Sequence, residues 1–344
     1  PLGTVINSAG TAPFIPGSTT VRASGGINAL DLPGGQGCDA IAGMGAYDDL
    51  LSDNAVAQYA CAWDAAQPAM LQQPIKTVSY YGKATIRIDD HKLYAELTGS
   101  KADSAKRFSS PQFSSNASTN NGNSFAYPRT AFSAATYDRV FNQLVGVFPS
   151  LEPRRGLPLA VRWRCAECGP REIETTSTTY RLTVGADGPI AGDWDYKVAA
   201  SYGESDVSST LGTGYYYRGT NRAGVVIGRG LVPAINSGFV NLFLLPGETQ
   251  SAEGMAELER ASAAGVRLYG GTFGVWQIDA SVSGSLFELP GGTVQLAAGV
   301  DWRRESYGFT GDTRPPADQA NEILLAPFDN NNALAGTERI VRAA

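Results

Sequence analysis

The sequence predicts an all-β protein whose long antiparallel strands form part of a transmembrane β-barrel with long extracellular loops. Three observations support this prediction. Apolar and polar residues alternate with a period of two, several of the alternating segments run to about ten residues or more, and tight turns alternate with very long links. Strands of soluble sheets usually have about five or six residues, whereas a tilted strand that crosses a bilayer needs about ten.

The clearest hairpin is predicted within residues 266–309. Its first strand places Trp276, Ile278, Ala280, Val282, Gly284 and Leu286 on one face, and Gln277, Asp279, Ser281, Ser283 and Ser285 on the other. A turn at Leu289-Pro290-Gly291-Gly292 leads into a second strand of the same kind, with Val294, Leu296, Ala298, Val300 and Trp302 on its apolar face. One face of this hairpin is therefore apolar and the other polar.

Two further hairpins are predicted at residues 74–103 and 158–208. The first turns at Asp89-Asp90, and the second turns near Asp187-Gly188. The returning strand of the second hairpin has an apolar face made of Trp194, Tyr196, Val198, Ala200 and Tyr202. Its aromatic residues lie near the ends of that face, where aromatic residues gather at the two surfaces of a membrane.

These hairpins supply six clear strands. Pro158 to Cys165, and the start of a strand at residues 337–344, bring the predicted number to eight. The intervening segments are predicted to be loops, and they cover residues 1–73, 104–157, 209–265 and 310–336. Loops of this length are uncommon in compact soluble domains, but they are the rule on the extracellular side of outer-membrane barrels.

Two short helices are predicted within the loops. Glu253 to Ala264 has Met255, Leu258 and Ala261 at helical spacing, and Ala55 to Ala65 is the weaker candidate.

Composition excludes several classes of function. The chain has 40 Gly, 19 Pro and 15 Tyr among 344 residues and a net charge of −6, which favours many strands joined by turns and gives no support to nucleic-acid binding. With a single histidine and no nucleophile motif, it lacks the usual general base of acyl transfer. We therefore predict no enzymatic activity, no catalytic residue, no cofactor and no metal.

The four cysteines are candidates for disulfides. Cys38 and Cys61 would close a loop in a Gly-rich stretch, and Cys165 and Cys168 would form a tight C-x-x-C bridge. A zinc site is disfavoured by the single histidine, and a thioredoxin-like role lacks the βαβ pattern that it needs. Disulfides fit an oxidising compartment outside the cytoplasm.

From about residue 70 to residue 344, the sequence resembles the barrel region of TonB-dependent receptors. The likeness is one of pattern. One motif is Gly169-Pro170-Arg171 leading into Thr179 to Gly185 and then Gly192 to Tyr196. The second and more specific motif is Leu289 to Gly292 followed by Ala297 to Glu305. Residues 1 to 70 match only as a loop.

The resemblance implies a 22-stranded barrel closed by an N-terminal plug domain, in the outer membrane of a Gram-negative bacterium. Such receptors use the TonB complex to drive uptake of scarce nutrients such as siderophore-bound iron, cobalamin or oligosaccharides. The chain has no recognisable plug or TonB box, and it ends at Arg342-Ala343-Ala344 without a terminal aromatic residue. We therefore expect an internal barrel fragment, whose partners are outer-membrane lipid, the substrate and, through the missing plug, the TonB complex.

Ligand contact in such a receptor is expected from aromatic and arginine residues of loops and lumen. Tyr215, Tyr216, Tyr217 and Arg218 are the predicted ligand-binding residues, followed by Arg303-Arg304. The alternative is structural: loop tyrosines pack against other loops, and lumen arginines pair with acids on adjacent strands.

Two other functions remain open. A secreted soluble β-rich protein that binds carbohydrate or another surface would also suit the cysteines and aromatics. A passive porin would share the alternation and would lack the plug and TonB box. Strand length and the asymmetry of the connections favour the barrel over the soluble protein.

Overall fold

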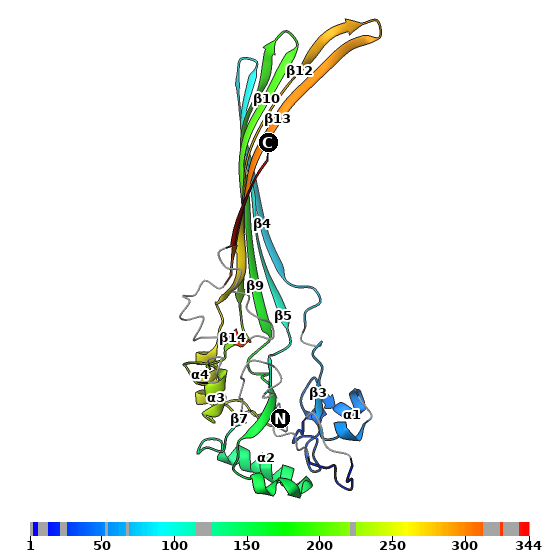
Figure 1. Ribbon diagram of the computed structural model, residues 1–344, viewed down its shortest axis with the longest axis vertical. Coiled ribbons are helices and arrows are strands. Elements are labelled where there is room, and N and C mark those ends of the chain that lie inside the picture. The colour runs from blue at the N-terminus through cyan, green and yellow to red at the C-terminus, as the bar shows by residue number, and fades with distance from the viewer. Residues whose placement is uncertain are drawn as a thin grey trace.

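A long antiparallel sheet stands on a folded unit of helices and short strands in the computed structural model (Figure 1). The structure describes residues 3–5, 13–20, 26–51, 54–66, 69–114, 126–220, 225–311, 324–325 and 337–343. Half of the chain is strand (50%) and 17% is helix, and the sheets are antiparallel. The predicted β-rich class is therefore confirmed at this level.

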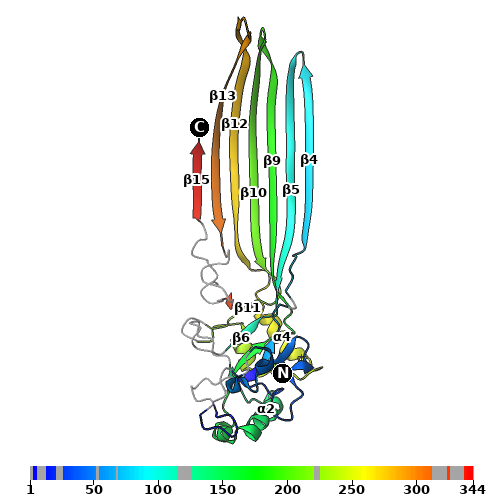
Figure 2. The ribbon, with the colours of Figure 1, turned by 90° about the vertical axis from the view of Figure 1, so that its right-hand side faces the viewer.

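The long sheet has seven strands in the order β15-β13-β12-β10-β9-β5-β4. They are β4 (Ile75–Ile88), β5 (His91–Phe108), β9 (Arg171–Ala191), β10 (Trp194–Leu211), β12 (Arg267–Leu289), β13 (Gly292–Thr310) and β15 (Thr337–Ala343). Figure 2 shows them side by side, with the three tight hairpin turns at one end of the sheet and the long links at the other. We call these the turn end and the base end.

The three predicted hairpins are β4–β5, β9–β10 and β12–β13. Five of their six strands have 18 to 23 residues and β4 has 14, so they run well beyond the usual strand length. At the base end, β5 and β10 continue to Phe108 and Leu211, a few residues past the expected boundaries. Among the described strands the sheet stays open, with β4 and β15 at its edges.

The expected eighth strand does not belong to the long sheet. β8 (Leu159–Arg164) pairs instead with β1 (Gly3–Val5), β6 (Gln112–Ser114) and β7 (Ala126–Tyr127). Its alternate residues Leu159, Val161 and Trp163 are buried in the unit below the sheet. The alternation predicted a strand correctly, but it could not specify which sheet the strand joins.

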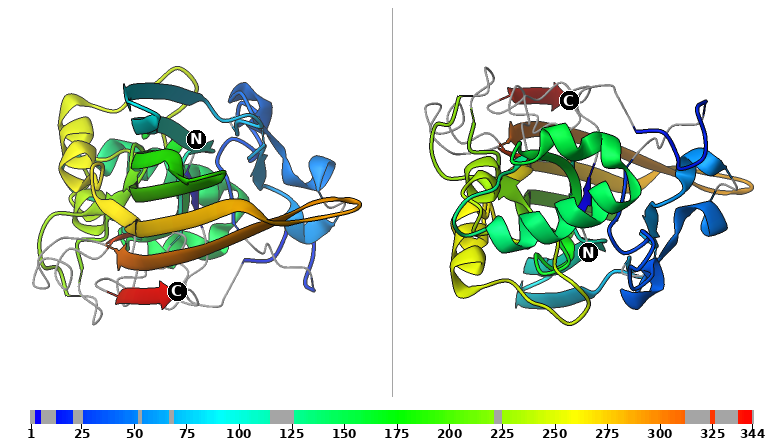
Figure 3. Two further views of the ribbon diagram at one scale, coloured as in Figure 1. Left: turned by 90° about the horizontal axis from the view of Figure 1, so that it is seen from above. Right: turned by 90° about the horizontal axis from the view of Figure 1, so that it is seen from below.

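The long links fold together into one unit, which we call the base and which comprises the described residues of 13–66, 109–170 and 212–266. It contains the helices α1 (Tyr47–Leu50), α2 (Ala134–Val147), α3 (Leu231–Asn236) and α4 (Ala252–Ala261), the hairpin of β2 (Met44–Ala46) with β3 (Cys61–Trp63), and the 3-10 turns at Cys38–Ala40, Ala55–Ala57 and Pro149–Arg154. Figure 3 shows α2 beneath the sheet when the molecule is seen from below. One hydrophobic cluster joins residues from all three links.

Of the two predicted helices, one is confirmed. α4 covers most of Glu253 to Ala264, and Ser251 caps it by accepting a hydrogen bond from the Gly254 amide at 3.0 Å. The predicted helix at Ala55 to Ala65 is wrong: it is a single 3-10 turn followed by β3. Pairing with β2 and a disulfide at Cys61 hold this segment extended.

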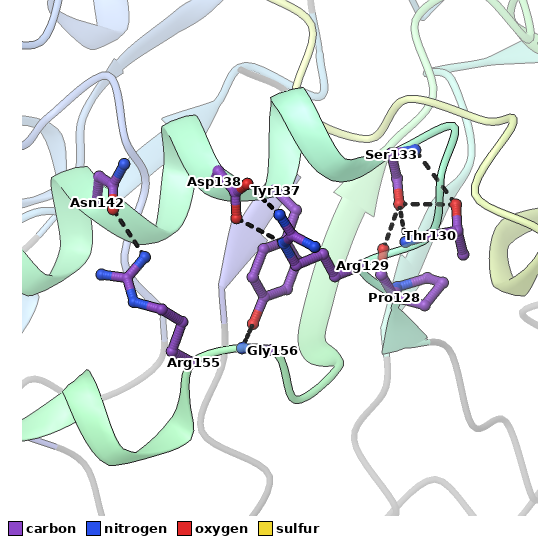
Figure 4. Close-up of polar contacts among 9 residues, drawn as sticks. All are labelled: Pro128, Arg129, Thr130, Ser133, Tyr137, Asp138, Asn142, Arg155 and Gly156. Atoms are coloured by element: carbon purple, nitrogen blue, oxygen red, sulfur yellow. Dashed lines mark hydrogen bonds and ion pairs between the residues drawn. The ribbon is translucent and has the colours of Figure 1, made fainter.

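Helix α2 was not predicted, and Figure 4 shows several of the polar contacts that hold it, among them those of Arg129 with Asp138 and of Tyr137 with Gly156. Arg129 donates two hydrogen bonds to the Asp138 carboxylate, at 2.8 and 2.6 Å. The Tyr137 hydroxyl donates to the Leu157 carbonyl at 2.6 Å and accepts from the Gly156 amide at 3.0 Å. These bonds tie the helix to the chain segments before and after it.

The base contains two disulfides. Cys38 is bonded to Cys61, and Cys165 is bonded to Cys168, which are the two pairings that the spacing favoured. The first closes the loop that carries α1, and the second closes the turn directly after β8.

The base is expected to lose stability above pH 10. Burial raises the pKa of Tyr127 to about 12 and the pKa of Tyr216 to about 12, whereas an exposed phenol titrates near 10. A raised pKa in the folded state means that this stability is complete below pH 10 and is lost as the pH rises through about 12. Unfolding followed by near-ultraviolet circular dichroism between pH 8 and 12 measures the loss. Tyr216→Phe should make it smaller, and an equal loss in this variant would contradict the assignment.

Candidate functional site

The two faces of the long sheet differ in chemistry. Directly opposed residues of neighbouring strands point to the same face, so the register defines rows of side chains across the sheet. One such row consists of Ile86, Leu93, Ala186, Val198, Ala280 and Val300. The face that carries this row is called the apolar face, and the opposite one the polar face.

Large side chains of the apolar face are exposed. Val300 is 73% exposed, Ile86 65% and Trp276 57%. Leu93, Leu182, Val184, Ile278 and Leu296 lie on the same face and are also exposed. A continuous apolar surface over six strands is larger than soluble monomers usually present, and it marks a surface that contacts something apolar.

Aromatic residues border this apolar surface toward the base. This base-side rim consists of Tyr80, Tyr180, Tyr202, Trp276 and Trp302. The rings of Tyr180 and Tyr202 lie 6.0 Å apart and those of Tyr202 and Trp276 4.5 Å apart. The rim is stepped: Tyr80 and Tyr180 share one row, Tyr202 and Trp276 the next toward the turn end, and Trp302 the one after.

A second group of rings borders the apolar surface toward the turn end. This turn-side rim consists of His91, Trp194, Tyr196 and Phe287. The Tyr196 hydroxyl lies 3.2 Å from His91 Nδ1. The apolar surface between the two rims is called the belt.

Some of the rings lie flat across a neighbouring strand because glycine is opposite them. A Cβ atom added to Gly99 would lie 2.4 Å from the Tyr80 ring, and one added to Gly284 would lie 2.5 Å from the Trp194 ring. Glycine at these places therefore admits the aromatic side chains of both rims.

Beyond the base-side rim, the same face becomes polar. Thr176 donates a hydrogen bond to Asp103, and Thr272 donates one to Asp206, both at 2.8 Å. Lys101 lies 3.6 Å from Asp103. The belt is thus bounded: aromatic rings and then charged groups follow it toward the base.

The polar face carries paired charges in its turn half. Lys83 contacts Glu96 at 3.2 Å, and Lys92 contacts Asp187 at 3.7 Å. The Gln277 amide donates to Asp301 at 2.6 Å. Cross-strand pairs of this kind are typical of a face that is in contact with water or with another polar surface.

Between these charges and the base, the polar face is largely neutral and rich in hydroxyl groups. Ser79, Ser100, Thr179 and Ser205 lie in one row across four strands. Nothing in the sequence distinguishes them, because each is an ordinary polar position of its own strand. Only the register brings them together.

The predicted ligand-binding residues are buried in the interior. Tyr215, Tyr216, Tyr217 and Arg218 are 2–6% exposed. Tyr216 packs edge-to-face against Phe113 at 5.9 Å in the base core, and β11 (Tyr216–Tyr217) pairs with β14 (Leu324–Leu325). All four side chains therefore pack inside the protein, as the structural alternative expects, and their contact with a ligand stays a prediction.

The second predicted pair is divided between the two faces. Arg303 lies on the polar face, 3.4 Å from Glu305 two residues along the same strand rather than from an acid on an adjacent strand. Arg304 is the register partner of Trp276 on the apolar face, at the base-side rim.

In the described part of the chain, no group of three or more His, Cys, Asp or Glu residues is arranged to hold a metal ion. No helix among the described residues is long and apolar enough to span a membrane. Comparison of the chain with family models, curated proteins and solved structures finds no significant match.

Proposed function

We propose that the long sheet is part of the wall of an outer-membrane β-barrel, and that the chain belongs to a TonB-dependent receptor that imports a scarce nutrient. The belt between two aromatic rims is the observation that supports membrane residence. Lipid acyl chains would cover its exposed apolar side chains, and the rims would lie at the two membrane surfaces.

The height of the belt supports this proposal. From Trp276 to Leu286, β12 spans about 33 Å at about 3.3 Å per residue. A strand tilted by about 30–40° would cross about 25–29 Å of bilayer over this length, close to the height of about 25 Å of the apolar band of outer-membrane barrels.

The open edges of the sheet also favour a barrel. Within the part that the structure describes, β4 and β15 each pair on one side only. Unpaired backbone groups are costly in lipid, because no water satisfies them. In the proposed receptor, further strands of the barrel pair with both edges.

The polar face would line the lumen, the tight turns would face the periplasm, and the base would form the extracellular cap. The receptor function itself rests on the sequence resemblance of the β9–β10 and β12–β13 hairpins. The charged pairs on the polar face are consistent with a wall that contacts water or a plug domain.

Quenching of tryptophan fluorescence by brominated lipids tests membrane residence. The complete receptor chain, in which further strands pair with β4 and β15, is folded into vesicles of phosphatidylcholine with brominated acyl chains, and Trp276→Phe, Trp302→Phe and Trp163→Phe are compared. Removing Trp276 or Trp302 should sharply reduce the quenchable fluorescence, because both lie on the belt side. Removing Trp163, which is buried in the base, should not.

The opposite pattern has a clear meaning. If bromolipid quenches none of the fluorescence assigned to Trp276 and Trp302, the belt does not meet lipid. The soluble β-rich binding protein would then be the better explanation of the sheet.

A further inference from the structure

A shallow hollow of about 450 Å³ lies on the long sheet where the polar face is neutral. Two adjoining rows of register partners form its surroundings. The lining includes Ser79, Tyr81, Thr98, Ser100, Thr179 and Arg181. Four of these six side chains carry an aliphatic hydroxyl, and one carries a charge.

The hydroxyl groups continue from the hollow onto β10. Thr179 and Ser205 share a hydrogen bond of 2.9 Å, and Arg181 donates to the Ser201 hydroxyl at 3.2 Å. A hydroxyl both donates and accepts hydrogen bonds, so a row of them matches a ligand that is itself covered with hydroxyl groups.

Aromatic side chains flank this row. On β4, Tyr81 of the adjoining row is 64% exposed, and at the other end of the row Phe273 on β12 and Tyr307 on β13 are exposed. Four strand spacings of about 4.8 Å separate β4 from β12, which leaves about 19 Å between the flanking groups. Such a surface combines flat apolar rings with polar groups that fix orientation, as ligand sites do.

Gly203 lies within the same area, as the register partner of Arg181 and Val275. Gly203 has no side chain, and its same-face neighbours on β10, Ser201 and Ser205, are small. The middle of the surface is therefore recessed between the flanking rings. An extended ligand can therefore lie across the strands.

The charge distribution selects among ligand classes. The cations nearest the hollow are each paired with a carboxylate: Lys83 with Glu96 in the next row toward the turn end, and Arg303 with Glu305 on β13. The single guanidinium of the hollow already donates to Ser201, and it can donate further to a sugar hydroxyl. A polyanionic ligand would meet carboxylates beside these cations, whereas a neutral polyol would find hydroxyl partners in the hollow.

We infer that this surface binds a neutral oligosaccharide, with Tyr81 packing against a sugar ring and the hydroxyl row contacting the sugar hydroxyls. The inference rests on the proposed function, because it takes the polar face to be the wall of an accessible lumen. It specifies one substrate class for the proposed receptor.

Calorimetric titration of the protein in vesicles tests this inference with maltohexaose, xylohexaose and cellohexaose, and with the anionic hexagalacturonate. We expect at least one neutral hexasaccharide to bind and hexagalacturonate not to bind. Tyr81→Ala should weaken binding by about tenfold or more, because it removes an aromatic contact. Tyr81→Phe keeps the ring and should retain most of the affinity.

Thr85→Ala is the matched control, since Thr85 lies on the polar face of the same strand but in the charged half. It should leave the affinity unchanged. Binding of hexagalacturonate alone, the absence of binding by all three neutral sugars, or equal effects of Tyr81→Ala and Thr85→Ala would overturn the inference.

Bromolipid quenching of each variant separates the two proposals. Normal quenching without sugar binding would overturn the oligosaccharide site and leave the membrane wall standing. Absence of quenching would overturn the membrane wall first, whatever the sugar result.

Discussion

An arginine at position 280 is expected to destabilise the protein in a bilayer by about 2–4 kcal/mol, whereas an arginine at position 281 is expected to cost less than about 1 kcal/mol. Ala280 lies in the middle row of the belt, between Val198 and Val300. Ser281 is its neighbour in β12 and points to the polar face, between Lys197 and Gly299. Ala280→Arg would place a charge near the bilayer centre, and Ser281→Arg would place it among polar groups.

The pair is well matched because both original residues are small and adjacent in one strand. Strand propensity and distance from the turn therefore differ little between the two variants. Reversible folding into phosphatidylcholine vesicles at increasing urea concentration, followed by tryptophan fluorescence, gives the free-energy difference. Equal losses at the two positions would mean that both faces meet the same environment, and the proposed wall would be wrong.

Trp163→Ala is expected to destabilise the base by about 3 kcal/mol, at the lower end of the range for removing a large aromatic side chain from a core. Trp163 is 1% exposed and packs against Phe113 at a centroid distance of 5.8 Å. Its indole N–H has no hydrogen-bond partner in the structure. The substitution therefore also removes a buried unpaired donor, which offsets part of the loss.

Arg162→Ala serves as the control, because Arg162 belongs to the same strand and points away from the core. It is expected to change stability by about 0.5 kcal/mol or less. Hydrogen exchange of base amides, measured by mass spectrometry, reports on this unit separately from the long sheet. If both variants exchange like the unaltered protein, the base core is not the cooperative unit described above.

The hairpins were predictable from sequence because each strand alternates over its whole length. Trp276 to Leu286 shows the pattern without knowledge of any partner, and a Pro-Gly turn fixes the return. The base was harder to predict. β8 pairs with strands of two or three residues from distant segments, and such short strands carry no readable period.

Helix α2 did leave a signal in the sequence. Tyr137, Val140, Phe141 and Leu144 are buried at helical spacing, so a search of residues 104–157 for a period of 3.6 would have found it. The six-residue α3, with Pro233 inside it, is too short to show such a period. Whether the consecutive tyrosines 215 to 217 are buried or exposed depends on segments that are distant in the sequence. The sequence of the tyrosines is the same in either case.

The stepped base-side rim has a geometrical consequence. From Tyr80 on β4 to Trp302 on β13, the rim advances by four residues, about 13 Å, over five strand spacings, about 24 Å. If the rim follows the membrane surface, the strands lean by about 30° from the bilayer normal, close to the tilt of known barrels. From Tyr202 to Leu211, β10 then rises about 25 Å above that surface. The barrel wall would extend beyond the outer membrane surface. The base would then lie above the lipid headgroups, within reach of large soluble molecules.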